Sequence, residues 1–154
     1  MSNILSQENK IQIVEHLNKI LSDEYVLFTK LFKYHWNVTG PFFGPLHTLF
    51  ENQYQALFVI IDEVAERSRA LNHVAFGTLK EFCQHTRLQE QPGHNPSSEK
   101  MITDLVTDHE TIINHLRSDI IIVEKLGDQG TMDFLTELMQ KHEKMAWLLR
   151  AHLQ

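Results

Sequence analysis

Glycine and proline divide this chain into four long segments. The six glycines and four prolines all fall at residues 40–45, 77, 92–96 and 127–130, and both residue types interrupt helices. Between these positions apolar residues recur every three or four residues, which is the spacing of one helix face, and no strand-like alternation persists. The sequence therefore predicts helices over residues 7–38, 45–72 and 131–152, a helix that Ser97 or Ser98 caps and Gly127 ends, and a short helical piece at 78–85.

Four helices joined by a tight, a long and a tight connection are typical of a four-helix bundle. The long central connection carries the short helix, and it can cross the bundle if the second and third long helices run parallel. A length of 154 residues supports one domain with a substantial core. We therefore expect an all-α fold and a single domain spanning residues 1–154, with about residues 1–6 as a short tail.

Composition narrows the classes of function. The chain has 14 basic and 20 acidic residues, a net charge of -6, which disfavours nucleic-acid binding and suits a protein that attracts cations. No apolar run approaches the roughly 20 residues of a membrane span, and the N-terminus lacks the features of a signal peptide. The single cysteine, Cys83, cannot form an internal disulfide, so a reducing cytoplasm is expected. Cys83 itself is expected to be a small buried hydrophobic residue.

Candidate metal ligands lie in the second predicted helix and just before it. His47 and Glu51 are four residues apart, as are Asp62 and Glu66, so each pair lies on one helix face. His35 continues the apolar stripe of the first helix and should face inward at its end. Histidines with carboxylates and no thiolate suit iron(II), manganese or zinc.

The two pairs are too far apart to share one metal within a single straight helix. Their centres are about 15 residues apart, or about 22 Å. Two copies packed antiparallel, with a two-fold axis near Ala56–Leu57, would bring the first pair of one copy to the second pair of the other and create two sites. The Glu-x-x-His motif of di-iron sites inside a bundle is absent, so the sequence favours a site between subunits.

Simpler interpretations remain open for several of these residues. His35 and His109 could each be a core histidine with a hydrogen-bond partner. Trp36 and the Phe42–Phe43 pair are expected to pack in the core, although an indole beside a redox site could also be oxidised sacrificially. Three acids near the start of the last helix could favour its dipole, or symmetry could gather them into a cation funnel: Asp128, Asp133 and Glu137.

Two motifs carry a resemblance to a known family. The chain reads H-W-N-V-T-G-P-F-F-G-P-L-H at 35–47 and D-E-V-A-E-R at 62–67. This two-part pattern resembles the signature of the Dps family, the DNA-binding proteins from starved cells or miniferritins. The resemblance implies a ferritin-like bundle with a short helix in its central connection and a hollow shell of twelve copies. It also implies oxidation of iron(II), preferentially by hydrogen peroxide, storage of ferric mineral and protection against oxidative damage.

The resemblance also implies roles for individual residues. His35, His47 and Glu51 would come from one subunit and Asp62 and Glu66 from its mate. Trp36 would lie beside this ferroxidase centre. Iron would be the metal, with zinc or another divalent cation as an alternative occupant at rest. The pores through which iron enters at the three-fold axes would be lined by three acids: Asp128, Asp133 and Glu137.

Two departures from the family pattern affect these expectations. Position 51 is glutamate where aspartate is the commoner family residue, which could shift the metal preference or spacing. The chain has no Lys or Arg before Lys10 and ends A-H-L-Q, so DNA binding by a lysine-rich tail is not expected. Two other hypotheses stay open: a nucleoid-associated, DNA-compacting protein with a secondary metal site, and a helical interaction protein without metal.

Overall fold

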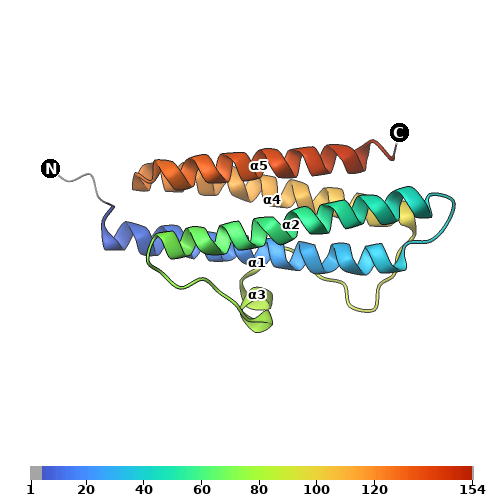
Figure 1. Cartoon of the computed structure of the whole chain (residues 1–154), viewed down its shortest axis with the longest axis horizontal. Helices are drawn as coiled ribbons and strands as arrows, with labels where there is room; N and C mark the ends of the chain where they lie inside the picture. Colours follow the sequence, from blue (N-terminus) through green and yellow to red (C-terminus); the bar gives the residue numbers. More distant parts are fainter. Residues whose placement is uncertain (1–4, 154) are drawn as a thin grey trace.

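The computed structural model describes residues 5–153, and in this part of the chain every regular element is an α-helix (Figure 1). The helices are α1 (Gln7–Asn37), α2 (Phe43–Ala70), α3 (Leu79–His85), α4 (Ser98–Leu126) and α5 (Gln129–Arg150). The predicted fold class, an all-α four-helix bundle with a short extra helix in the central connection, is confirmed. The predicted helix ends lie within two residues of the observed ones.

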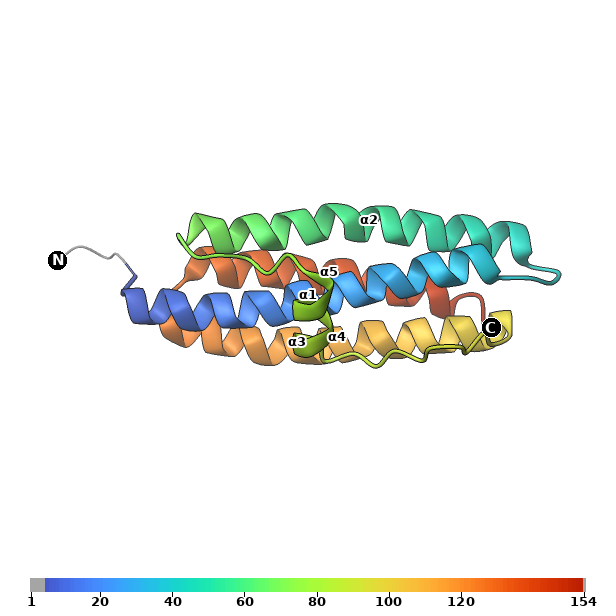
Figure 2. The ribbon, with the colours of Figure 1, turned by 90° about the horizontal axis from the view of Figure 1, so that it is seen from below.

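The bundle consists of two antiparallel hairpins. α1 and α2 form the first, and α4 and α5 form the second (Figures 1 and 2). The connection from α2 to α4 carries α3 past α1 and then continues along the bundle to its other end, so α2 and α4 run in the same direction. This is the crossing connection that the sequence predicted.

Short-range capping signals set several helix ends. The side chain of Ser97 accepts a hydrogen bond from the Lys100 amide at the start of α4, and Thr78 forms a reciprocal capping box with Glu81 at the start of α3. Gly127 ends α4 with a left-handed φ of 86°, a conformation that costs glycine little. Ser97 and Gly127 are confirmed in the roles that the sequence predicted.

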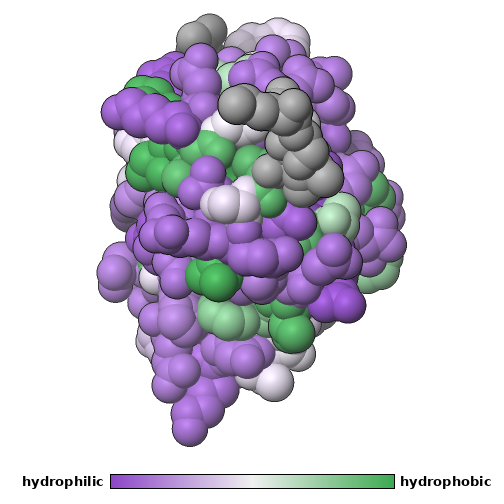
Figure 3. Space-filling model, turned by 90° about the vertical axis from the view of Figure 1, so that its left-hand side faces the viewer, coloured by the Kyte–Doolittle hydropathy of each residue, from purple (hydrophilic) through white to green (hydrophobic). Residues whose placement is uncertain are grey.

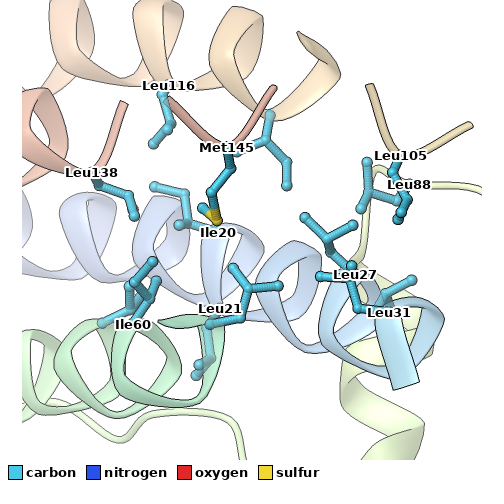
Figure 4. Close-up of a cluster of buried hydrophobic side chains, with 14 of the residues drawn as sticks. Ile20, Leu21, Leu27, Leu31, Ile60, Leu88, Leu105, Leu116, Leu138 and Met145 are labelled. Carbon is cyan, nitrogen blue, oxygen red and sulfur yellow. The ribbon is translucent and has the colours of Figure 1, made fainter. Parts of the chain in front are cut away.

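All four long helices contribute apolar side chains to one core. Figure 4 shows Leu21 of α1, Ile60 of α2 and Leu116 of α4 in this cluster with residues of α5. Phe50 is among the largest fully buried side chains. Burial of this continuous apolar surface is the main force that holds the two hairpins together.

Buried ion pairs fasten the central connection to the bundle. Arg87, just after α3, places Nε 2.7 Å from Asp23 Oδ2 of α1 and Nη1 3.0 Å from Asp119 Oδ2 of α4. His16 Nδ1 lies 2.8 Å from the other oxygen of Asp119. Burial alone would raise the pKa of Asp119, but the bonds from His16 and Arg87 lower it overall. These ion pairs fix the connection to α1 and α4, in addition to the apolar packing of Phe82 and Leu88 in the core.

Two predictions about the core are wrong. Cys83 is exposed, because α3 turns the adjacent Phe82 toward the protein instead. Trp36, Phe42 and Phe43 are 69%, 64% and 45% exposed, respectively. Trp36 follows the inward-facing His35, and a step of about 100° per residue turns it away from the core. Phe42 lies in the turn where the hairpin reverses, and Phe43 is the first residue of α2, so both lie at the end of the bundle and outside its core.

Candidate metal centre

His35 and His47 face each other across the end of the α1–α2 hairpin. His35 Nδ1 lies 2.8 Å from the backbone carbonyl of His47, and His47 Nδ1 lies 2.8 Å from the backbone carbonyl of His35. The two rings stack with centroids 3.7 Å apart and planes 15° apart. Each histidine therefore fixes the backbone position of the other, and the pair closes the hairpin.

These hydrogen bonds determine the tautomer of both rings. A carbonyl oxygen can only accept, so each Nδ1 must carry the hydrogen and donate it. In the neutral ring Nε2 then keeps a lone pair, which is the form that binds a metal. The hairpin thus presents two imidazole ligands in which Nδ1 is bonded to the backbone and Nε2 is left for a metal.

Aromatic neighbours and Glu51 complete this end of the site. Phe43 stacks on His47 with centroids 4.9 Å apart, and Tyr54 packs edge-on against His35 at 5.3 Å. Glu51, one turn after His47, has Oε1 3.5 Å from the Tyr54 hydroxyl and 3.3 Å from Gln55 Nε2. Burial and the charge of Glu51 raise the pKa of Tyr54, so the phenol stays protonated. Both contacts are longer than a strong charge-assisted bond, so the Glu51 carboxylate can still bind a cation.

Asp62 and Glu66 lie on the same helix but well away from the histidines. Both are exposed, and within residues 5–153 neither forms an ion pair, whereas the neighbouring Glu63 pairs with Lys141. Their distance along α2 from the His47–Glu51 pair is about 22 Å at the rise of a helix. Among the described residues no three histidine, cysteine, aspartate or glutamate side chains of one copy converge on a possible metal position. One subunit therefore brings only His35 and His47 into contact. Glu51 follows one helix turn after His47, and Asp62 and Glu66 lie near the other end of α2.

An apolar groove adjoins Asp62. It is lined by α2 residues, including Phe58 and Val59, and by Leu79 and Phe82 of α3. Phe58, Val59 and Leu79 are 67%, 54% and 67% exposed. A contiguous exposed apolar surface of this kind is typical of an interaction site.

The three acids near the start of α5 differ in their surroundings. Asp128 is only 5% exposed; it caps α5 through Thr131 and binds Arg67 Nη2 at 3.0 Å. Burial would raise its pKa, but the bonds from Thr131 and the Arg67 guanidinium lower it overall. Asp133 and Glu137 are exposed, and Glu137 lies 3.3 Å from Lys141. Asp128 is thus engaged inside its own subunit, whereas Asp133 and Glu137 are open to solvent. This end of the bundle is largely hydrophilic (Figure 3).

A second cluster of polar side chains lies in the centre of the bundle. His109 is fully buried and hydrogen-bonded, which confirms that it is a satisfied core histidine. Its partners His142 and Gln53 are also buried, as is Glu24, which binds His142. Sequence analysis missed Glu24 and Gln53, although a charged residue three positions after Leu21 and three before Leu27 interrupts an apolar face and is a usable signal.

Within the described residues, no helix has the length and apolar character needed to cross a membrane.

Comparison with known proteins gives consistent results. Residues 14–154 match the ferritin-like domain family. A low temperature-induced protein of Nostoc sp. is 42% identical over 151 residues, which cover 97% of this chain and 84% of that protein. DNA protection during starvation protein 2 of Bacillus anthracis is 37% identical over 142 residues, covering 92% of this chain and 97% of that protein.

Solved structures share the fold over nearly the whole chain. Dps from Thermosynechococcus elongatus has a TM-score of 0.91 at 33% identity, covering 96% of this chain and 93% of that one. Dps from Vibrio cholerae, described as a member of a broad superfamily of ferritin-like diiron-carboxylate proteins, has a TM-score of 0.92 at 25% identity, with coverage of 97% and 94%. Sequence and fold agree with the resemblance carried by the two motifs, and this chain belongs to the Dps family of ferritin-like proteins.

Proposed function

We propose that pairs of this chain form ferroxidase sites that oxidise iron(II), preferentially with hydrogen peroxide, and that twelve copies form a shell storing the ferric product. The protein would thereby remove two reactants that together damage the cell. Relatives named as DNA protection during starvation proteins and a general stress protein of Bacillus subtilis support a protective role. The ferritin-like family and the diiron-carboxylate description of the Vibrio cholerae structure support iron as the metal.

The histidine pair carries this proposal. His35 and His47 each use Nδ1 for a backbone carbonyl, which leaves two Nε2 lone pairs at one end of the hairpin. Glu51 adds a carboxylate one turn away. Nitrogen and oxygen ligands without thiolate suit iron(II), and zinc could occupy the same ligands at rest. This set is half of a metal centre, because it lacks the negative charge needed to stabilise iron(III).

A partner subunit would supply the other half. Asp62 and Glu66 are exposed, and Asp62 lines the apolar groove of Phe58, Val59 and Leu79. An antiparallel contact of two α2 helices about an axis near Ala56–Leu57 would cover that groove and bring Asp62 and Glu66 of the partner subunit to the histidines. An isologous contact forms two such sites.

The reaction needs two electrons for each peroxide. Two Fe²⁺, one H₂O₂ and two H⁺ give two Fe³⁺ and two H₂O. Delivery of both electrons at one site breaks the O–O bond without releasing hydroxyl radical. The two imidazole and three carboxylate side chains of the proposed site would hold the iron ions close enough for this. Trp36 follows His35 on the exposed side, where its ring lies 5.2 Å from that of Phe32. We assign to Trp36 the interception of any single-electron oxidant that escapes.

Iron entry would use the acids of α5 that face solvent. Asp133 and Glu137 are exposed, and three copies about a symmetry axis would concentrate negative potential there. Asp128 is left out of this role because its carboxylate binds Arg67 and Thr131.

DNA binding is the second candidate function, and the names of the relatives are the observation that favours it. The charge of -6 argues against it, and the N-terminal tail that the sequence analysis considered lies partly in residues 1–4, outside the described residues. We expect no retention of plasmid DNA on a gel near neutral pH. Retention at low salt that added salt reverses would favour this function instead.

The ferroxidase proposal is tested by mixing protein with iron(II) without oxygen, adding hydrogen peroxide, and following ferric absorbance beside a hydroxyl-radical trap. Wild type should oxidise iron quickly with little trapped radical. The variant His47→Ala with Asp62→Ala should fall to the rate of buffer. A matched control, His94→Ala with Glu124→Ala, removes an exposed histidine and an exposed acid elsewhere and should behave as wild type. Full activity in the first variant would refute the proposal.

A further inference from the structure

One residue from each long helix joins a hydrogen-bond chain through the centre of the bundle. Glu24 Oε1 of α1 lies 2.8 Å from His142 Nε2 of α5, and His142 Nδ1 lies 2.9 Å from His109 Nδ1 of α4. His109 Nε2 lies 3.2 Å from Gln53 Oε1 of α2, and Gln53 Nε2 lies 3.1 Å from the backbone carbonyl of Met145. These four side chains are at most 3% exposed. From this geometry we propose that the bundle core is a binding site for one proton, held between Glu24 and His142.

The direction of the hydrogen bonds follows from the fixed end of the chain. The Met145 carbonyl can only accept, so Gln53 Nε2 donates to it and Gln53 Oε1 is left to accept. His109 must therefore donate from Nε2. Burial, the charge of His142 and that of Arg150 hold the pKa of His109 well below its usual range, so His109 is neutral and its Nδ1 accepts.

This fixes the proton count at the other end. Because His109 Nδ1 accepts, His142 Nδ1 must donate to it. The bond between His142 Nε2 and Glu24 Oε1 then has two forms: an imidazolium with a carboxylate, or a neutral imidazole with a carboxylic acid. Both forms hold one proton in that bond. Without it, two lone pairs would face each other at 2.8 Å in a core that water does not reach.

Glu24 has no alternative way to satisfy its charge. Within the described residues its second oxygen, Oε2, is buried and has no hydrogen-bond partner. A buried carboxylate that lost its only donor would keep nearly the whole cost of desolvation. The proton also joins the two hairpins, because Glu24 belongs to the first and His142 to the second.

The other charges near the site do not replace this proton. α1 contributes Glu24, α4 contributes His109 and α5 contributes His142, whereas α2 contributes only the uncharged Gln53. The Arg150 guanidinium acts on His109, but it lies 2.8 Å from Glu110 at the surface and is largely neutralised there. α3 packs against α1, and its acid Glu81 is bonded to the backbone amides of Gly77 and Thr78.

Proton retention makes folding depend on pH in a defined direction. In water the pKa of a glutamate is about 4.3 and that of a histidine is about 6.5. Well above pH 7 the unfolded chain has released the protons of this network, whereas the folded chain of the proposal keeps one. The unfolded state then binds fewer protons, so a rise of one pH unit favours unfolding about tenfold. Below about pH 6 the unfolded chain binds two protons on the histidines and the folded chain one, so the dependence reverses.

The variant Glu24→Gln tests this count. Its amide can donate to His142 Nε2, which keeps every hydrogen bond of the chain without the extra proton. The assembled wild type, Glu24→Gln and a matched surface control, Glu124→Gln, would be unfolded in urea at pH 7 and pH 8. From pH 7 to pH 8 the folding equilibrium constant per subunit should fall about tenfold further for the wild type and the control than for Glu24→Gln. Equal pH dependence of all three would overturn the proposal.

A direct measurement does not depend on the variant folding. Neutron diffraction from deuterated wild-type crystals at about pH 8 should show deuterium on His109 Nε2, on His142 Nδ1 and in the bond between Glu24 and His142. Absence of deuterium from that last bond, or a metal ion between the rings, would overturn the proposal. Neither experiment uses iron, so its outcome is independent of the ferroxidase proposal.

Discussion

Mixing two inactive variants should restore iron oxidation, because the proposed sites draw ligands from two subunits. His47 and Asp62 of one chain are about 22 Å apart along α2, so they belong to different sites. In a dimer of one His47→Ala subunit and one Asp62→Ala subunit, one site carries both changes and the other carries neither. Equal, random mixing makes about half of the dimers heterodimers with one intact site in two, so the rate should be about a quarter of wild type.

The assay needs a control in which mixing cannot help. The two chains would be co-produced in equal amounts, and the initial rate of ferric absorbance after peroxide addition would be compared with that of each variant alone. Asp62→Ala mixed with Glu66→Ala is the matched control, because both changes remove a ligand from the same half-site. Each site of that heterodimer lacks one carboxylate, so no rescue is expected. Equal rates in the two mixtures would refute the division of ligands between subunits.

Three further predictions concern assembly and stability. Phe58→Glu puts a charge into the exposed apolar groove and should dissociate the dimer in analytical ultracentrifugation while leaving the helical circular dichroism intact; an unchanged mass would contradict the assigned interface. Phe50→Ala, at a fully buried site, should cost about 3–5 kcal/mol and lower the urea midpoint, whereas Phe42→Ala at the exposed hairpin end should change it little. The lowered pKa of Asp128 stabilises the fold above about pH 4, the unfolded value, and this contribution is lost as pH falls through the folded-state pKa. The stability advantage of wild type over Asp128→Asn should therefore be largest at pH 7 and should shrink as pH falls below about 4. A difference that stays constant into acid would show that charge is not the cause.

Local signals made most of the fold predictable from the sequence. Ser97 and Gly127 act through hydrogen bonds and backbone conformation within a few residues, so the ends of α4 follow from neighbours in the chain. The helical positions of His47, Glu51, Asp62 and Glu66 depend only on the period of α2, and so does their separation into two groups. The proposal that the groups meet in a dimer remains a prediction.

Features that depend on distant segments could not be read from the sequence. The reciprocal bonds of His35 and His47 depend on how five loop residues close the hairpin. The exposure of Trp36 and Phe42 depends on the same loop, and the prediction from hydrophobicity alone that both lie in the core was therefore wrong. The contact of Glu24 with His142 joins residues 118 positions apart and depends on the docking of two hairpins. Asp128 was predictable as a helix cap, but its partner Arg67 is 61 positions away.

The separation of the ligands along α2 has a consequence for a newly made subunit. With the proposed ligands, a single chain has two imidazoles and one carboxylate at one end of the α1–α2 hairpin and two carboxylates near the other, so it would not hold a pair of iron ions together. Catalysis would begin only when a second chain docks on the apolar groove. The rate of iron oxidation would thus depend on the concentration of folded protein. A damaged or unpaired subunit would not oxidise iron and would release no reactive product.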